Sequence, residues 1–192
     1  MARRLIGTAV TDSNGEATIT YTGTGAGKLN VVAESGTFVS QPYSILDTLF
    51  FDDCTDNTKA SKYHRYNNTV SEPSFDETGM FVERTSTGNG YLFVGQSNST
   101  DNPYALDFAV EFDVVNVSGD VRFLTGGTFD GIRSMSANDH YKVEYYTNKQ
   151  VVTKNSDTPT ETAKTNSGSF RCQLQFVGVG SIKLKNIRVY SI

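Results

Sequence analysis

Strict alternation of apolar and polar residues is the feature that most constrains the fold of this chain. Residues 104–115 show it best, because one phase is apolar and the other carries carboxylates. Side chains two positions apart lie on the same face of a strand, so the segment is predicted to be a β-strand with one face in a core. The apolar phase is Tyr104, Leu106, Phe108, Val110, Phe112 and Val114, and the polar phase includes Asp107, Glu111 and Asp113.

The same period of two continues through residues 48–192, and no helical period interrupts it. Polar segments at 55–74, 96–103 and 155–167 have the composition of exposed loops. Many strands without helices predict an all-β fold, here a two-sheet jelly-roll β-sandwich. Asn186 breaks the phase of the last strand and predicts a β-bulge. The further expected strands are 49–53, 80–84, 91–95, 120–125, 140–147, 150–154, 169–177 and 181–190.

Residues 1–47 have shorter alternating segments with tight turns, including Asn14-Gly15, a hairpin signal. Strands are expected at 5–10, 16–22, 28–34 and 37–45. The runs TDSNGEATITYT (11–22) and GKLNVVA (27–33) resemble the C-terminal half of bacterial immunoglobulin-like repeats of the invasin and intimin type. Such modules occur in surface adhesins and in phage fibre proteins. The resemblance divides the chain into a partial immunoglobulin-like anchoring or oligomerisation module, 1–47, and a jelly-roll recognition domain, 48–192.

A partial sandwich leaves one apolar face uncovered. Symmetry mates, a partner protein or the rest of this chain could cover it. We therefore expect a homo-oligomer, with a trimer favoured because threefold intertwining would complete the module.

The charge pattern excludes several classes of partner. The formal net charge is −4 and no block of Lys and Arg occurs, so neither nucleic-acid binding nor attraction to an anionic membrane is expected. No apolar run is long enough to insert into a membrane, and no secretory signal follows Met1. A sticky β-rich protein made in the cytosol suggests a virion component, with the cell surface as the alternative location.

Cysteine and histidine spacing predicts neither a metal site nor a cofactor. Cys172 lies on the apolar phase of an expected strand and is predicted to be a buried free thiol, with a disulfide to Cys54 as the alternative. Asp52 and Asp53 could help hold a structural calcium ion, but adjacent strand residues point to opposite faces.

The outward phase of the strands supplies the candidate ligand-binding residues. If those strands share one sheet, its outer face presents planar donors and acceptors that suit sugar hydroxyls; on a convex sheet the same residues would only be solvated. The loop 62–68, KYHRYNN, clusters aromatic and amide groups and could form a rim of the site. The predicted ligand-binding residues are Glu111, Asp113, Arg122, His140, Tyr146, Arg171 and Gln173.

The strands at 107–115 and 181–190 resemble those of concanavalin A-like and carbohydrate-binding jelly rolls. The run EFDVVN (111–116) is also similar to the bulged catalytic strand of laminarinase-like glycoside hydrolases. That resemblance implies a nucleophile at Glu111 and an assisting carboxylate at Asp113. Asn116, however, stands where the proton donor belongs, and an amide cannot protonate a leaving group. We therefore expect no enzymatic activity.

These observations favour a virion fibre or receptor-binding component. Its expected partners are other virion structural proteins and a host cell-surface glycan. Three alternatives stay open: a purely structural capsid or tail decoration protein, a fragment of a cellular adhesin, and, more remotely, a degenerate glycoside hydrolase.

Overall fold

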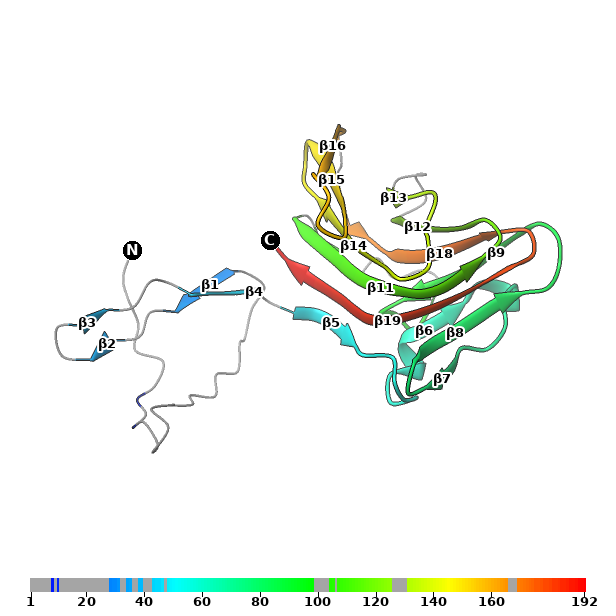
Figure 1. The fold of residues 1–192 in the computed structure, drawn as a ribbon, viewed down its shortest axis with the longest axis horizontal. Coiled ribbons are helices and arrows are strands. Elements are labelled where there is room, and N and C mark those ends of the chain that lie inside the picture. Colours follow the sequence, from blue (N-terminus) through cyan, green and yellow to red (C-terminus); the bar gives the residue numbers. More distant parts are fainter. Residues whose placement is uncertain are drawn as a thin grey trace.

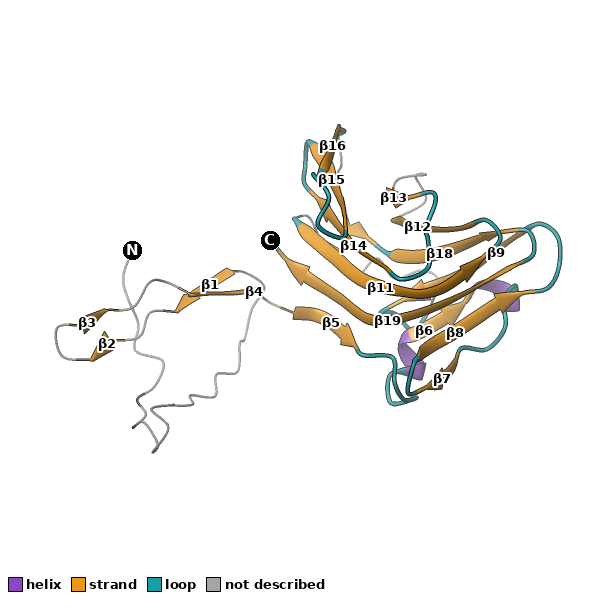
Figure 2. Ribbon diagram, viewed as in Figure 1, coloured by secondary structure: helices purple, strands orange, loops and turns teal. Residues whose placement is uncertain are grey.

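The computed structural model describes residues 8, 10, 28–31, 34–35, 38–39, 43–46, 48–98, 104–105, 107–125, 131–165 and 169–192. Strands dominate this part of the chain, and two short 3-10 helices flank β6 (Figure 2). No helix of the described residues is long and apolar enough to cross a membrane. The expected strands at 5–10 and 16–22 lie almost entirely outside the described residues.

The N-terminal strands form nested hairpins. In the outer hairpin β1 (Lys28–Val31) pairs with β4 (Tyr43–Leu46), and in the inner hairpin β2 (Glu34–Ser35) pairs with β3 (Phe38–Val39). β1 and β2 lie within the single strand expected at 28–34, and β3 and most of β4 lie within the one expected at 37–45. The immunoglobulin-like identity of the module stays a prediction.

The larger sheet of the sandwich has eight strands, seven of them in the order β16-β15-β14-β11-β19-β8-β7, with β5 also pairing to β19 (Figure 1). The long central strands β11 and β19 run side by side. The strands are β5 (Thr48–Asp52), β7 (Ser74–Asp76), β8 (Gly79–Arg84), β11 (Phe108–Ser118), β14 (Asp139–Tyr145), β15 (Lys149–Lys154), β16 (Thr160–Ala163) and β19 (Gly180–Ser191).

The smaller sheet has five strands in the order β13-β12-β18-β9-β6. A short pair, β10 (Tyr104–Ala105) with β17 (Ser169–Phe170), lies outside both sheets, and η1 (Ala60–Lys62) and η2 (Tyr66–Asn68) flank β6. The strands of the smaller sheet are β6 (Tyr63–Arg65), β9 (Asn89–Val94), β12 (Val121–Thr125), β13 (Gly131–Ile132) and β18 (Cys172–Val177).

The inward phases of the two sheets form one core. Phe112 of β11 and Phe123 of β12 meet across it with ring centroids 4.7 Å apart. Cys54 and Cys172 are both buried free thiols, which confirms the prediction made for Cys172. The all-β jelly-roll sandwich is therefore confirmed.

Two local predictions were modified by long-range pairing. The strand expected at 104–115 divides into β10 and β11, and that at 169–177 into β17 and β18, because β10 and β17 pair with each other rather than with either sheet. The bulge predicted at Asn186 is present: Glu111 and Asp113 of β11 lie opposite Arg188 and Lys185 of β19, so the latter strand contains an extra residue.

Candidate functional site

The predicted ligand-binding residues lie on two different sheets. A single binding face would need their strands to share one sheet, and they do not. β12 and β18 pair with each other in the smaller sheet, and β11 and β14 pair in the larger sheet on the other side of the core. Glu111, Asp113, His140 and Tyr146 follow the outward phase of the larger sheet, and Arg122, Arg171 and Gln173 that of the smaller one.

On the larger sheet, Asp113 is held from both sides. Its Oδ1 lies 2.7 Å from Nδ1 of His140, and its Oδ2 accepts a hydrogen bond of 2.6 Å from Nδ2 of Asn186 at the bulge. Both carboxylate oxygens are thus engaged by neighbours on the same face.

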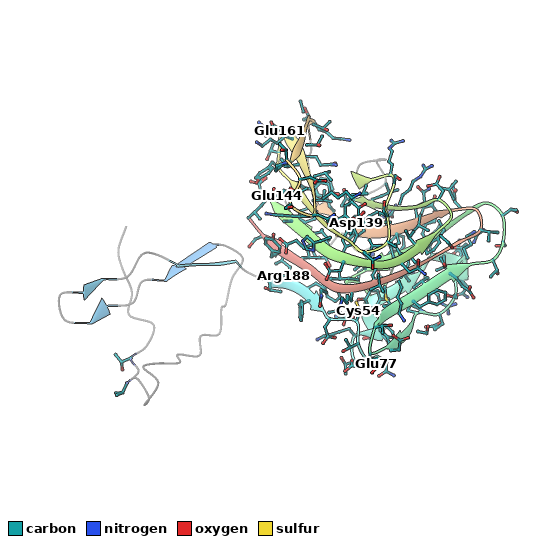
Figure 3. The ribbon with its side chains drawn as sticks, in the orientation of Figure 1. Cys54, Glu77, Asp139, Glu144, Glu161 and Arg188 are labelled. Atoms are coloured by element: carbon teal, nitrogen blue, oxygen red, sulfur yellow. The ribbon has the colours of Figure 1, made fainter. Side chains whose placement is uncertain are left out.

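Glu111 is held in a similar way. It accepts a hydrogen bond from the hydroxyl of Tyr190, and the Arg188 guanidinium lies 5.0 Å from the centre of the Tyr190 ring. The hydroxyl of Tyr146 donates to Glu144 over 3.3 Å. Figure 3 labels Arg188 and Glu144 on this sheet. Mutual compensation of this kind is typical of a solvated sheet face.

A bulge lies in the part of β11 whose sequence resembles a glycosidase strand. Val114 lies opposite Leu184 and Asn116 opposite Lys183, so Val115 is an extra residue on β11. The side chain of Val117 packs against the core, which leaves Asn116 on the outer face with Glu111 and Asp113. The side-chain oxygen of Asn116 accepts a bond from the backbone N–H of Val117. The bulge is present, but an amide stands at the position of the proton donor.

Phe93 forms the centre of the outer face of the smaller sheet. Its ring is nearly parallel to that of His64, with centroids 6.0 Å apart. The guanidinium of Arg171 lies 4.8 Å from its centre. Register explains this grouping, because His64, Phe93 and Gln173 are directly opposite one another on β6, β9 and β18. Phe93 is only 3% exposed, so its neighbours, both half-buried, form the surface.

Tyr66 provides an exposed aromatic ring beside this centre. It is 41% exposed and makes edge contacts with Tyr91 and Phe93, at centroid distances of 6.2 and 6.1 Å. The loop 62–68, predicted as a rim of aromatic and amide groups, therefore lies next to Arg171 and Phe93.

Three hydrogen bonds fix the backbone that carries Tyr66. The hydroxyl of Thr69 donates to the carbonyl of Tyr66 over 2.7 Å and accepts from the N–H of Tyr91 over 3.1 Å. The buried guanidinium of Arg84 donates to the carbonyl of Thr69. Gly90 permits the close approach, since a Cβ there would lie 2.9 Å from that carbonyl oxygen. The position of Tyr66 is thus set by the fold rather than by the loop alone.

Two glutamines of β18 lie beneath the surface groups. Gln173 is 5% exposed and Gln175 is 2% exposed, and Nε2 of Gln175 donates to the hydroxyl of Tyr91 over 3.1 Å. Gln173 was predicted to contact ligand directly, but its burial leaves it little surface. Arg122 binds Asp120 through two hydrogen bonds of 2.8 and 2.6 Å, which lower the pKa of that carboxyl.

The two sheets differ in where carboxylates occur, although the strands of both carry basic residues. All five strands of the smaller sheet lie in the described part of the chain, and none contains Asp or Glu, whereas they carry the basic residues His64, Arg65 and Arg122. The strands of the larger sheet carry Asp52, Asp76, Glu83, Glu111, Asp113, Asp139, Glu144 and Glu161.

A buried polar cluster joins β5 to β6. Asp52 is 3% exposed; its Oδ2 accepts a 2.6 Å hydrogen bond from the hydroxyl of Tyr63, and its Oδ1 accepts one of 2.8 Å from the N–H of Cys54. Burial raises the pKa of the Cys54 thiol to about 12 and also raises that of Tyr63. Asp53 is exposed and binds Thr55 instead, so the carboxylates of Asp52 and Asp53 do not point toward a common calcium site. The described residues contain no cluster of metal ligands.

Sequence reasoning did not single out Tyr91 and Phe93. The sequence does contain a signal, because the residues of 91–94 are apolar on both faces of the strand. A strand of that kind has both of its faces buried. The pairing of β9 with β6 and β18 shows which side chains cover the outer face: His64 and Arg171 lie against Phe93.

The sequence matches no protein-family model and no curated protein. Among solved structures, the chain is similar to a protein of unknown function with a galectin-like fold from Bacillus subtilis: identity is 6%, the TM-score is 0.50, and the match covers 76% of this chain and 96% of that one. It also matches the SPRY domain of human HERC1, with 9% identity and a TM-score of 0.39 over 64% of this chain and 98% of that one. The likeness to the first of these shows that the chain has a galectin-like jelly-roll fold.

Proposed function

We propose that this chain is a non-enzymatic glycan-binding module of a virion fibre, and that the outer face of the smaller sheet is its binding surface. The observation that carries the proposal is the grouping of Tyr66, His64 and Arg171 around Phe93. Sugars present C–H faces that pack on aromatic rings and hydroxyls that need planar donors and acceptors. Aromatic side chains with a few well-placed polar groups are typical of ligand sites.

The rigidity of Tyr66 supports this choice of face. The backbone of Tyr66 is held by Thr69, which Arg84 holds in turn, and its ring rests edge-on against Tyr91 and Phe93, so it loses less conformational freedom when a sugar packs on it. On the larger sheet the carboxylates and amides bind one another, so a ligand would have to displace those partners first.

The virion context rests on the N-terminal resemblance. Within the described residues, β1 and β4 pair only with each other, as do β2 and β3. Such small hairpins gain stability when further strands cover them. Other copies of this chain, a trimer by preference, or other virion structural proteins would supply that cover, and the sandwich would present its smaller sheet to a host cell-surface glycan.

The absence of catalysis is part of the proposal. Retaining hydrolysis needs a proton donor beside the nucleophile, and Asn116 offers an amide at that place. Release of reducing sugar from a panel of β-glucans that is lost in Glu111→Gln would contradict it.

A glycan array with the full chain tests the proposal. We expect reproducible binding that falls about tenfold or more in Tyr66→Ala, since loss of one aromatic contact in a site costs about 1–2 kcal/mol. Tyr146→Ala is the matched control, because Tyr146 is a half-buried tyrosine on the other sheet and packs beside Lys149 at 5.3 Å.

The array also separates the alternatives. If Tyr146→Ala abolishes binding and Tyr66→Ala does not, the larger sheet is the binding face and the smaller one is not. A blank array with a folded protein would contradict glycan recognition and favour a capsid or tail decoration protein.

A further inference from the structure

Three side chains form a row across the outer face of the smaller sheet. Arg122 of β12 lies opposite Gln175 of β18, and Gln175 lies opposite Tyr91 of β9. Tyr66 extends the row, because its ring meets that of Tyr91 edge-on with centroids 6.2 Å apart. Gln175 is 2% exposed, whereas both tyrosines reach the surface. The row therefore places a buried amide directly beside two aromatic side chains that a ligand can contact.

Gln175 sets the role of the Tyr91 hydroxyl. Nε2 of Gln175 donates to the hydroxyl oxygen of Tyr91 over 3.1 Å. A phenol that accepts such a bond keeps its own O–H for donation. No hydrogen bond between residues that the structure describes uses this O–H as a donor. The half-buried Tyr91 therefore offers a hydrogen-bond donor to a ligand above the sheet.

Arg122 explains which end of the amide faces Tyr91. Arg122 lies on the other side of Gln175 in the row, and a cation is favoured next to a carbonyl oxygen rather than next to an N–H. The charge of Arg122 is itself balanced by Asp120, to which its Nε and Nη2 donate over 2.8 and 2.6 Å. With the amide oxygen favoured on the arginine side, Nε2 is the end that remains for Tyr91.

The oxygen of the same amide is a second, independent observation. Oε1 of Gln175 is buried and has no hydrogen-bond partner among the described residues. Buried polar atoms without partners are rare, and each one destabilises the folded chain. An apolar residue of similar size would fill this position without that loss. An amide is expected here if it positions a neighbour, and the neighbour that it binds is Tyr91.

Tyr66 and Tyr91 are close enough to contact one sugar unit together. We propose that the ligand is a saccharide whose C–H face packs on Tyr66 and one of whose oxygens accepts a hydrogen bond from the hydroxyl of Tyr91. Gln175 is then a positioning residue that keeps this hydroxyl a donor. The inference rests on the proposed glycan-binding function and defines the group that the site selects, an oxygen acceptor next to an apolar sugar face.

Deoxy and deoxyfluoro sugars test the direction of this hydrogen bond with the full chain. Fluorine accepts a hydrogen bond but cannot donate one, and a deoxy position does neither. The probes are methyl glucoside, methyl galactoside and methyl mannoside, each with one hydroxyl replaced at a time, in NMR titrations. We expect one position at which the deoxy sugar binds about fivefold more weakly than the parent sugar, the contribution of one hydrogen bond. The fluoro sugar should retain more affinity than the deoxy sugar at that position.

Tyr91→Phe assigns the effect to one hydroxyl, because it keeps the ring and removes the O–H. It should weaken binding of the parent sugar about fivefold and make the deoxy and fluoro sugars bind alike. Tyr190→Phe is the matched control, because that hydroxyl donates to Glu111 on the opposite sheet, and the difference between the two sugars should persist. Thermal melting checks that each variant is folded.

Gln175→Glu tests the positioning role. An ionised carboxylate, which Arg122 favours at this place, only accepts hydrogen bonds, so it should bind the O–H of Tyr91 and withdraw it from the ligand. The difference between fluoro and deoxy sugars should then vanish although the tyrosine is intact. If Gln175 has only a structural role, all sugars should lose affinity by the same factor.

The outcomes separate this inference from the function on which it rests. Equal affinity for deoxy and fluoro sugars at every position overturns the inference and leaves glycan binding intact. Tyr91→Phe is also tested on the array glycans, and binding as tight as that of the natural chain overturns the inference as well. If a folded Gln175→Glu chain keeps the difference, Gln175 is not a positioning residue. If no array glycan binds the natural chain, the proposed function itself fails.

Discussion

The two outer faces of the sandwich carry the same local motif in different surroundings. On the smaller sheet Arg171 lies 4.8 Å from the centre of Phe93, and on the larger sheet Arg188 lies 5.0 Å from that of Tyr190. Tyr190 donates to Glu111, whereas the neighbour of Phe93 is His64. An arginine over a ring therefore has no fixed surroundings: on the larger sheet its ring partner donates to a carboxylate, and on the smaller sheet its ring partner stacks with a histidine.

The largest expected effect comes from removing a core contact between the two sheets. Phe112 is fully buried and meets Phe123 of the opposite sheet, so Phe112→Ala should lower the free energy of unfolding by about 3–5 kcal/mol. Urea unfolding followed by fluorescence and circular dichroism would measure this. Phe51→Ala should be close to neutral, since Phe51 is 50% exposed. Two separate transitions in the sandwich would contradict a single shared core.

A smaller effect should come from the polar link between β5 and β6. Asp52→Asn removes the charged acceptor of the Tyr63 hydroxyl and should cost about 2 kcal/mol, because hydrogen bonds to buried charged groups are strong. Hydrogen exchange should increase most in β6, which carries His64. Asp53→Asn is the control, since that carboxylate is exposed and binds only Thr55 among the hydrogen bonds described. Equal losses in the two variants would show that burial of Asp52 does not matter.

The sequence predicted the core well because alternation is a local property. Phe108, Val110 and Phe112 were assigned to one inward phase, and all three are fully buried. The bulge at Asn186 was also visible, because a break in phase needs an extra residue. The three-residue strand β6 was missed, since Tyr63-His64-Arg65 is too short and too polar to show a period.

The proposed binding face was harder to predict, because alternation tells which residues point outward but not which sheet they belong to. Arg171 and Glu111 have the same pattern around them, yet long-range pairing separates them into opposite sheets. Burial by neighbours is equally invisible: Gln173 points outward and is still 5% exposed. The rim at 62–68 was recognised from its composition, and its position beside Phe93 was not.

The smallest expected effect is on the free energy of unfolding at low pH, through one carboxyl on the outer face of the larger sheet. Asp139, labelled in Figure 3, pairs with Lys154 at 2.9 Å and accepts a bond from Asn155, and these contacts lower the pKa of its carboxyl. A carboxyl whose folded pKa is depressed adds stability above its unfolded pKa of about 4 and loses it as the pH falls through the folded value. The stability difference between the natural chain and Asp139→Asn should therefore be constant above about pH 5 and fade as the pH falls through the lowered pKa of the folded chain. Glu77→Gln, at an exposed carboxylate, is the control in urea unfolding across this range. A difference that grows in acid would show that the pKa of Asp139 is raised in the folded chain, against the pairing with Lys154 and Asn155.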